Sequence, residues 1–502
     1  MMPPAEELYA ENIELKTENS KLRAHIAWLK KKLFGGGQSE KLDRAQLLLT
    51  LGELENKIAQ APKVETITYQ REKADAQARR EANQKAFEKL PVTETIVIDP
   101  DEVKAEPAAY EKIGEEKTVE LDIIPPRLIK REIIRPKYRR KDNRARPPLL
   151  APSPARPVPG GYASAGLIAY IIIAKYHDHQ PLRRLETQSA RWGLPIPAQS
   201  MVEWMRIASE LLEPIYKLMR TGLLNSGYMQ IDETPVRCND PGQPRGGTTK
   251  SYLWVMGAPG ADVVFEWKQN RAHEHAAQLL GENYRGTLQS DAYPAYKHYA
   301  ASHPEVEAAG CWAHARRHIF EAQAEHPKAT RVALKLIARL YRLEREWDEQ
   351  GVGGDHVRAF YRTRHFERTL RWLKTLAQEG RAKVLPKSLC GEAITYLLNQ
   401  WETLEAHTRL GWTRLDNNLI ENAIRPCAIG KKNWLFIGHP DAGQRTAILY
   451  SIIISCKRRG RDPHAYLRDV LTRLPAMSTR DDLSVLLPAN WQAPASQVVV
   501  NA

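Results

Sequence analysis

Hydrophobic residues recur every seven positions near the start of the chain, which is the period of a coiled coil. The d positions are Leu8, Leu15, Leu22 and Leu29, and the a positions are Asn12, Asn19, Ile26 and Leu33. Asparagine at a weakens the seam but favours a parallel dimer in one register, because a misaligned asparagine would face an apolar partner. The pattern predicts a dimeric leucine zipper over residues 1–34. A lone amphipathic helix is the alternative.

The pattern changes twice before residue 161. Residues 35–90 are rich in Ala, Gln, Glu and Lys and predict a helical linker. The runs "TETIVID", "KTVELDIIP" and "RLIKREIIRPKYRRK" then alternate like short strands. The following "RARPPLLAPSPARPVPGG" is proline-rich and basic, which is typical of a linker.

Three helices are predicted over residues 164–176, 181–192 and 198–218. Gly193 separates the second from the third, as the turn of a helix-turn-helix unit would. Small helical domains that never touch DNA give the same pattern. The cationic side chains that favour DNA contact are Arg183, Arg184 and Arg191.

From residue 227 the period becomes that of strands. "GYMQIDETPVRC", "SYLWVMGA" and "DVVFEWKQ" predict three meandering strands, "HEHAAQLLG" a helix and "GTLQSDAYPAY" another strand. Residues 320–410 read as mostly helical, and "GQRTAILYSIIISCKRRG" as an apolar helix with a cationic end. The fold class expected is multidomain α/β with a mixed sheet.

The stretch "LDNNLIENAIRPCAIGKKNW" predicts an amphipathic helix. Its buried stripe would be Leu415, Leu419, Ile420, Ala423 and Ile424. A second face carries Asn417, Glu421 and Arg425, with Asn418 and Asn422 beside them. This face is either solvated, with a Glu421–Arg425 pair one turn apart, or it presents the Glu421 carboxylate to a ligand.

Composition narrows the class of protein. A chain of 502 residues with 42% hydrophobic residues suggests three or four folded domains. Its 74 basic and 60 acidic residues give a net charge of +14, which suits a polyanionic partner. The five cysteines include no CxxC pair, and the longest apolar runs are too short to cross a bilayer. We therefore expect a cytoplasmic, nucleoid-associated protein.

Two aspartates occur within or at the end of predicted strands. Asp232 lies in "QID" inside an apolar strand, and Asp291 lies in "LQSD" at the end of another. An unpaired carboxylate is costly to bury, so both plausibly point into one site. Magnesium needs such hard oxygen ligands on rigid elements, and Glu421 on a helix across the sheet would complete a two-metal site.

Other polar residues have weaker patterns. Cys311, His314 and His318 have ligand-like spacing but lack a fourth ligand nearby, so no zinc is expected. The side chains of His314, Arg316 and Arg317 are expected to face a nucleic-acid backbone or to serve packing. Further cations that would neutralise phosphates, or be ordinary surface charges, are Arg425, Lys431, Lys432, Lys457, Arg458 and Arg459.

Five ordered motifs resemble one family. "QIDETPV", "LQSDAYPAY", "CWAHARRHIF", "LDNNLIENAIRP" and "GKKNWLF" resemble the DDE-type transposases of the insertion-sequence-sixty-six family. The resemblance extends to "LFGGGQSEKL", "AKYHDHQPLRRLE" and "PHAYLRDVLTRLP", and so covers nearly the whole chain. It implies a ribonuclease-H-like core interrupted by a helical insertion, in which Asp232, Asp291 and Glu421 hold two Mg²⁺ or Mn²⁺ ions.

The sequence departs from that family at one place. Members usually carry a cysteine-rich zinc-binding segment between zipper and core, whereas residues 99–146 contain no cysteine. Four-coordinate structural zinc is excluded there for lack of thiolates. Any contribution of this segment must come from its strands and its run of Arg and Lys.

The expected activity is DNA strand cleavage at the ends of a bacterial insertion sequence, followed by 3′-hydroxyl strand transfer. Alternatives are a non-catalytic DNA-binding regulator and a nuclease of the same fold that cuts without joining. Expected partners are terminal-repeat and target DNA, a second copy of the chain and small accessory proteins of the element. The expected segments are a zipper (1–34), a helical linker (35–90), a β/basic segment and linker (91–160), a helix-turn-helix-like unit (161–220), the catalytic core (221–319 and 411–460), a helical insertion (320–410) and a C-terminal helix and tail (461–502).

Overall fold

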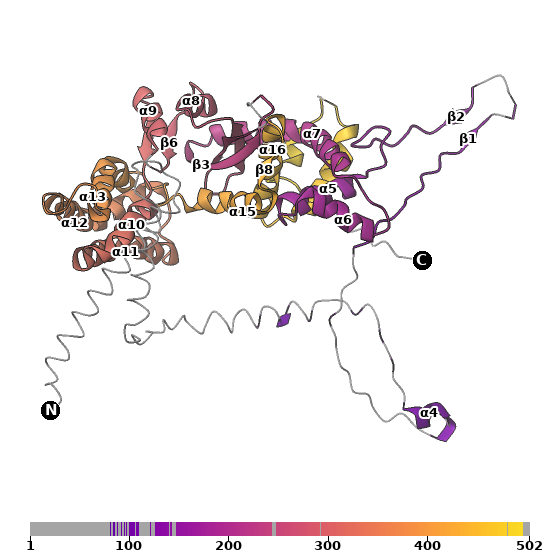
Figure 1. The fold of residues 1–502 in the computed structure, drawn as a ribbon, viewed down its shortest axis with the longest axis horizontal. Helices are drawn as coiled ribbons and strands as arrows, with labels where there is room; N and C mark the ends of the chain where they lie inside the picture. Colours follow the sequence, from indigo (N-terminus) through magenta and orange to yellow (C-terminus); the bar gives the residue numbers. More distant parts are fainter. Residues whose placement is uncertain are drawn as a thin grey trace, which may run out of the picture. The chain divides into compact units, whose positions relative to one another are not determined.

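The computed structural model describes residues 147–494, apart from 243–246, 292 and 479, and shorter stretches between 81 and 142. The chain divides into two units, Met1–Pro126 and Arg127–Ala502. In the first unit the described elements are helix α4 (Asp101–Ala105) and a short 3-10 helix, Pro107–Ala109. The predicted zipper lies outside the described residues. The second unit carries the sheet and the helices discussed below (Figure 1).

The second unit begins with an extended two-stranded arm. Strand β1 (Lys137–Tyr138) pairs antiparallel with β2 (Leu149–Leu150), and Arg135 Nη1 donates to the Ala151 carbonyl at 3.0 Å. The ladder is shorter than the predicted strand over 127–141, and β2 comes from the segment predicted as linker. Prolines on both strands explain the difference, because they lack the N–H that a longer ladder needs.

The three helices predicted next are confirmed. They are α5 (Ala165–Tyr176), α6 (Leu182–Arg191) and α7 (Ala198–Leu224). Ser164 caps α5 by accepting from the Leu167 N–H at 3.2 Å. Gly193 has φ +96°, a conformation that glycine adopts without steric cost, so α6 turns sharply toward α7.

One mixed sheet follows, with strand order β5-β4-β3-β6-β7. The strands are β3 (Tyr228–Asn239), β4 (Thr248–Gly257), β5 (Val263–Lys268), β6 (Gly286–Gln289) and β7 (Val306–Ala309). The first three form an antiparallel meander, while β6 and β7 run parallel to β3. Two helices, α8 (Glu274–Leu280) and α9 (Pro294–Ser302), connect the later strands, and β8 (Phe436–Ile437) pairs with the end of β3. The predicted meander, helix and further strand are confirmed.

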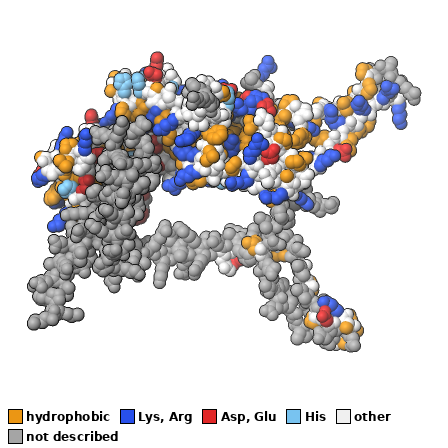
Figure 2. Space-filling model, viewed as in Figure 1, with side chains coloured by type: hydrophobic (Ala, Val, Ile, Leu, Met, Phe, Trp, Pro, Cys, Tyr) orange, Lys and Arg blue, Asp and Glu red, His pale blue; other side chains and the backbone are white. Residues whose placement is uncertain are grey.

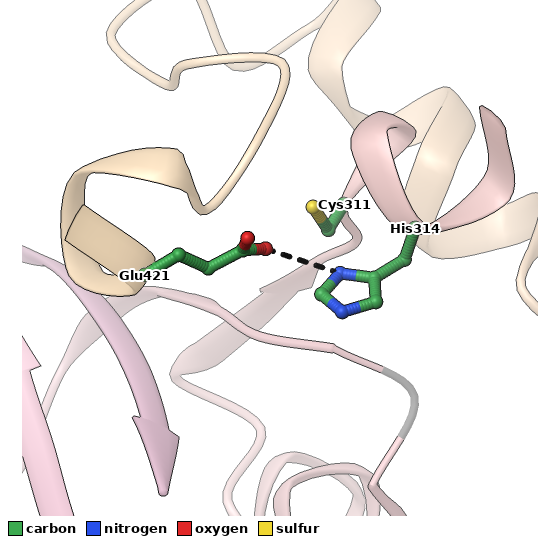
Figure 3. Close-up of side chains that lie close together, drawn as sticks. All are labelled: Cys311, His314 and Glu421. Atoms are coloured by element: carbon green, nitrogen blue, oxygen red, sulfur yellow. Dashed lines mark ion pairs between the residues drawn. The ribbon is translucent and has the colours of Figure 1, made fainter. Parts of the chain in front are cut away.

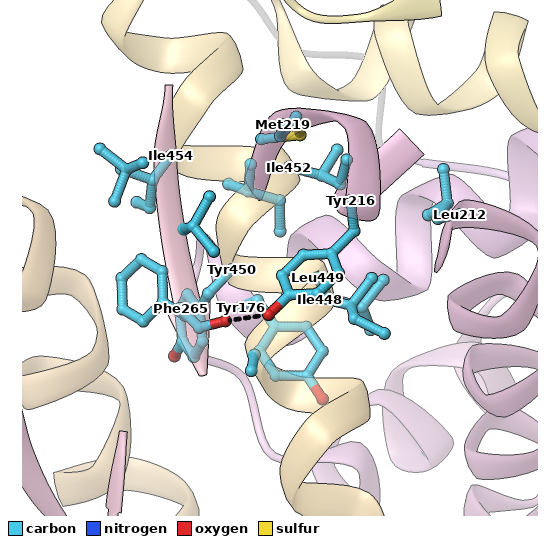
Figure 4. Close-up of a cluster of buried hydrophobic side chains, with 14 of the residues drawn as sticks. Tyr176, Leu212, Tyr216, Met219, Phe265, Ile448, Leu449, Tyr450, Ile452 and Ile454 are labelled. Carbon is cyan, nitrogen blue, oxygen red and sulfur yellow. Dashed lines mark hydrogen bonds between the residues drawn. The ribbon is translucent and has the colours of Figure 1, made fainter. Parts of the chain in front are cut away.

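The edge strand β5 is covered by α16 (Asp441–Arg458), the predicted apolar helix with a cationic end. Ser451 Oγ accepts from the Phe265 N–H at 2.8 Å, and Ser455 Oγ accepts from the Val263 N–H at 2.9 Å. These bonds satisfy donors that an uncovered edge would leave free. Figure 4 shows the apolar side chains of α5, α7, β5 and α16 packed together. The helices before the sheet therefore share its core, as does α17 (Pro463–Arg473).

The insertion predicted over residues 320–410 consists of α11 (Pro327–Glu349), α12 (Asp355–Arg381), α13 (Leu389–Asn399) and α14 (Trp401–Glu405). The preceding helix α10 (Trp312–Glu321), which was expected to belong to the catalytic core, packs with these helices instead. The insertion has a hydrophobic core of its own. At one side of that core Arg362, only 1% exposed, donates to both carboxylate oxygens of Glu344 at 2.8 Å. Among the described helices, none is long and apolar enough to span a membrane.

Candidate active site

The register of the sheet places Asp232 beside Asp291. Strands β3 and β6 are parallel, with Gln230 opposite Gln289. Each aspartate lies two residues further along its own chain segment: Asp232 is still within β3, opposite Val255 of β4, and Asp291 lies just beyond the end of β6. Neighbouring strands lie about 4.8 Å apart, which keeps the two carboxylates close to each other.

The third carboxylate comes from α15 (Asn418–Trp434), whose first turn contains Glu421. Two buried amides hold the start of this helix against β3. Asn417 Nδ2 donates to the Ile231 carbonyl at 3.0 Å, and Gln230 Nε2 donates to the Asp416 carbonyl at 2.9 Å. The helix therefore begins directly beside the residue that precedes Asp232.

This docking corrects part of the sequence interpretation. Asn417 was assigned to the polar face with Glu421 and Arg425, but it is completely buried. As the residue before the first helical turn, it directs its side chain to β3 instead of following the helical face. Ile420, Ala423 and Ile424 are buried as predicted.

The carboxyl of Asp232 has a strongly raised pKa. Burial raises its pKa to about 8, and the negative charges of Asp291, Glu233 and Glu421 act in the same direction. The backbone N–H of Glu233 donates to its Oδ1 at 2.8 Å and opposes the shift. Three carboxylates from β3, the β6 end and α15 thus act on one another electrostatically, although they are far apart in sequence.

Glu421 is paired with α10 and not with Arg425 in the following turn. Its Oε1 lies 3.6 Å from His314 Nδ1, and its Oε2 lies 3.6 Å from Arg317 Nη2 (Figure 3). Oε1 and Nδ1 are buried atoms with no hydrogen-bond partner among the described residues. A buried carboxylate oxygen left without a donor is what a cation site requires.

Cys311, His314 and His318 have the sequence spacing of metal ligands, but their three side chains do not come together in the structure. His318 stacks against Tyr396, with ring centroids 4.4 Å apart. Cys311 and His314 instead meet Glu421, with their ligand atoms within 4.8 Å of one another (Figure 3). Cys311 Sγ accepts from the Asn417 N–H at 3.3 Å, and burial raises its pKa to about 12, which disfavours the thiolate that binds metals.

Among the described residues, the group whose possible ligand atoms lie within 4.8 Å of one another is Cys311, His314 and Glu421, and it includes neither Asp232 nor Asp291. The second candidate set of metal ligands is the one expected from the sequence, Asp232, Asp291 and Glu421. Their donors are all carboxylate oxygens, the ligand type of Mg²⁺ and Mn²⁺. A divalent cation would place a positive charge beside the Asp232 carboxylate and so offset its burial and the negative charges around it. The raised pKa of Asp232 and the unpartnered Oε1 of Glu421 both fit such a group.

A layer of residues beside Asp232 was missed by the sequence interpretation. Arg271 pairs with the buried Glu233 carboxylate, which also accepts a hydrogen bond from the Tyr296 hydroxyl at 2.5 Å. The Arg271 guanidinium lies 3.8 Å from the centroid of the Tyr293 ring, and the Tyr293 N–H donates to Asp291 Oδ1 at 3.0 Å. Nothing in the spacing of these residues signals the contact. Gln230 and Gln289, which are buried and hydrogen-bonded to each other, could have been found from the repeated Gln-x-Asp of "QID" and "QSD", a pattern that the sequence analysis did not use.

The predicted DNA-contacting cations lie in different environments. The exposed ones are Arg183, Arg184, Arg191, Arg316, Arg317, Arg425, Lys432 and Lys457. Lys431 instead donates to the Pro235 carbonyl at 2.9 Å, and Arg458 to the Ala258 carbonyl at 2.8 Å. Arg459 donates to Asp262 Oδ1 at 2.7 Å. The last three therefore hold the fold together in this structure.

Family models and related proteins match nearly the same residues of the chain as the motifs described above. Residues 160–445 match the model of the Transposase IS66 family, residues 451–489 that of the IS66 C-terminal element, and residues 21–95 one described as Transposase C of IS166 homeodomain. Uncharacterized protein y4jD of Sinorhizobium fredii (strain NBRC 101917 / NGR234) is 30% identical over 496 residues, 94% of each chain. Uncharacterized protein y4qI of the same strain is 31% identical over 418 residues, 80% of this chain and 76% of the relative. The chain belongs to the IS66 family of transposases.

Proposed function

We propose that the protein is a DDE transposase that cleaves DNA strands at the ends of its element and joins the freed 3′-hydroxyl to target DNA. The observation that supports the proposal is that the negative charges of Asp291 and Glu421 both act on the carboxyl of Asp232, although the three residues come from β3, the segment after β6, and α15. The strand order, with an antiparallel meander followed by parallel strands, supports a ribonuclease-H-like core. The helical insertion precedes the helix that carries the last carboxylate, as the family resemblance implies.

The three carboxylates would hold two divalent cations, Mg²⁺ or Mn²⁺. Such a pair supplies Lewis-acid activation of the attacking oxygen and charge stabilisation of the leaving oxygen. The role of the protein is to present Asp232, Asp291 and Glu421 from three rigid elements, so that no ligand must be reorganised during the reaction.

Side chains around the carboxylates support this role. Asn417 and Gln230 fix the first turn of α15, and thereby the position of Glu421. His314 and Arg317 approach Glu421 from α10 and orient its carboxylate in the absence of a cation. Arg317, which is partly exposed, also stands where a phosphodiester bound at the carboxylates would meet positive charge.

DNA is the proposed substrate and target. The net charge of +14 and the exposed arginines of α6, Arg183, Arg184 and Arg191, support attachment to phosphates. Dimerisation through the predicted zipper would bring two copies to the two ends of one element. Small accessory proteins of the element remain proposed partners.

The test is Glu421→Gln, assayed on duplexes copied from the DNA that flanks the gene. Glutamine keeps the size of the side chain but removes the charge that a divalent cation requires. We expect cleavage and joining to fall by roughly a thousand-fold or more, a barrier increase of several kcal/mol, while the dissociation constant for DNA stays within a few-fold. Glu405→Gln, an exposed glutamate at the end of α14, is the matched control.

The alternatives give different results in the same assay. A regulator without catalysis would bind the ends, but the parent protein would not cut them in Mg²⁺. A nuclease would cut without forming joined products. Full joining by Glu421→Gln would remove Glu421 from the active site.

A further inference from the structure

The arm before α5 has an unusual composition for an exposed strand pair. Between residues 127 and 139 the chain contains Arg127, Lys130, Arg131, Arg135, Lys137 and Arg139 but only one acidic residue, Glu132. Every one of these side chains is exposed. The concentration of positive charge far exceeds that of the chain as a whole.

The basic residues share one side of the extended segment. In an extended chain, side chains two positions apart point the same way, about 6.6 Å from each other. Arg127, Arg131, Arg135, Lys137 and Arg139 all occupy odd positions, so an extended course of the segment places these five in one cationic row, while Lys130 lies outside it. Figure 2 shows Lys and Arg along the arm, interspersed with hydrophobic side chains.

The arm also exposes apolar surface that it does not bury by itself. Ile134 is 76% exposed, Tyr138 66% and Leu149 68%. An isolated two-stranded ribbon is marginally stable in water, because it has too little apolar surface to bury. Leu128 and Val158 pack against the core at the two ends of the arm, which anchors it but leaves its length uncovered.

Addition of another protein strand to the arm is disfavoured. Pro136 interrupts the outgoing strand, and Pro147, Pro148, Pro152 and Pro154 interrupt the returning one. Each proline removes an N–H that a further strand would use. The charge row would also repel the same row of a second copy, whereas a polyanion complements it.

We propose that the arm, residues 127–139 and 147–156, binds duplex DNA through its phosphates. The ligand class rests on the proposed function, which makes DNA the substrate. A two-stranded ribbon fits the major groove, and the outgoing strand, about 40 Å long at about 3.3 Å per residue, reaches across roughly one helical turn. The cationic row contacts the backbone, while Ile134, Tyr138 and Leu149 lie against the sugars and groove walls.

The experiment compares two variants with equal loss of charge. One carries Arg127→Gln, Arg131→Gln, Lys137→Gln and Arg139→Gln in the arm, and leaves Arg135, which bonds to Ala151, in place. The control carries Lys328→Gln, Arg331→Gln, Lys335→Gln and Arg339→Gln, four exposed cations of α11. Dissociation constants of the full chain for a duplex copied from the element end are measured by fluorescence anisotropy from about 50 to about 250 mM salt.

We expect the arm variant to bind on the order of 100-fold more weakly at low salt, with a log–log salt slope smaller by about three to four. The α11 variant should change both quantities much less. Equal losses in the two variants would mean that only overall charge matters, and would overturn the proposal. Unchanged affinity together with a changed sedimentation behaviour would assign the arm to a second copy of the chain instead.

A second measurement does not depend on variants. Lys130 and Lys137 of the parent protein should be protected from an amine-reactive label by the duplex, whereas Lys328 and Lys335 should not. Labelling of the arm that is identical with and without DNA would contradict the proposal. These readouts are independent of strand cleavage, so an arm-dependent protein that never cuts DNA would refute the proposed function alone.

Discussion

Replacing Asp232 with asparagine is expected to stabilise the protein when no divalent cation is bound. The folded-state pKa of this carboxyl is raised to about 8 from 3.8, so it stays protonated in the folded protein while it would ionise in the unfolded chain. Its contribution to the free energy of unfolding is complete below about pH 4 and is lost as the pH rises through about 8. Asparagine keeps the size of the side chain and does not titrate.

The expected gain in the free energy of unfolding follows from the difference between the folded and unfolded pKa of Asp232. Near pH 7 the unfolded carboxyl lies about three pH units above its pKa, which corresponds to up to about 4 kcal/mol at about 1.4 kcal/mol per unit. We therefore expect the melting temperature of Asp232→Asn to exceed that of the parent by up to about 5 °C near pH 7, with the difference vanishing near pH 4.

The assay is thermal unfolding followed by circular dichroism between about pH 4 and about pH 8.5, with chelator and then with millimolar Mg²⁺. Mg²⁺ should stabilise the parent by mass action and leave Asp232→Asn unaffected. Asp441→Asn, at a position that is 74% exposed, should follow the parent throughout. Parallel melting curves of the parent and Asp232→Asn across the pH range would refute the electrostatic reasoning.

Three further outcomes are expected. Asn417→Ala should lower the free energy of unfolding by about 1–3 kcal/mol, because the Ile231 carbonyl loses its donor. It should also reduce the rate of DNA cleavage more than the affinity for DNA. A variant that cleaves DNA as fast as the parent would show that this hydrogen bond does not position α15. Arg271→Gln should be destabilising because it leaves the buried Glu233 carboxylate unpaired, and adding Glu233→Gln should restore stability in chemical denaturation; additive losses would contradict this. Arg362→Met should destabilise the helical insertion by about 3–5 kcal/mol, since the buried carbonyls of residues 407, 410 and 413 lose a donor and Glu344 keeps only Arg358, 3.6 Å away, as a charged partner among the described residues; limited proteolysis of the insertion checks it.

Local patterns in the sequence were sufficient for most individual elements. The strands β3, β4 and β5 alternate with period two, and the helices α5, α6 and α16 carry apolar positions and clear end signals, so their places could be read directly. The three carboxylates were also proposed from the sequence, because a carboxylate in an apolar strand needs a reason to be there. The proximity of Asp232 and Asp291 follows from the parallel register of β3 and β6, and that of Glu421 from the docking of α15 on β3, neither of which a local pattern contains.

The arm shows where local reading was insufficient. Alternation predicted a strand over residues 127–141, but a ladder also needs a partner with free N–H groups, and the partner supplied by the chain is rich in proline. Residues 137–138 of the predicted strand pair with residues 149–150 of the predicted linker, and this pairing depends on the chain folding back on itself, which no local pattern shows.

Contacts between distant segments decided the chemistry of the site. Glu421 and Arg425 have the spacing of a helical ion pair, yet Glu421 turns to His314 and Arg317, more than a hundred residues earlier in the chain. Asn417 has the sequence spacing of a surface residue, yet it is buried, because its side-chain amide donates a hydrogen bond to the Ile231 carbonyl of β3. Sequence alone determined the elements and the residue types, since these depend on neighbours along the chain. The tertiary structure alone decided which polar groups are buried together, because burial and charge coupling depend on neighbours in space.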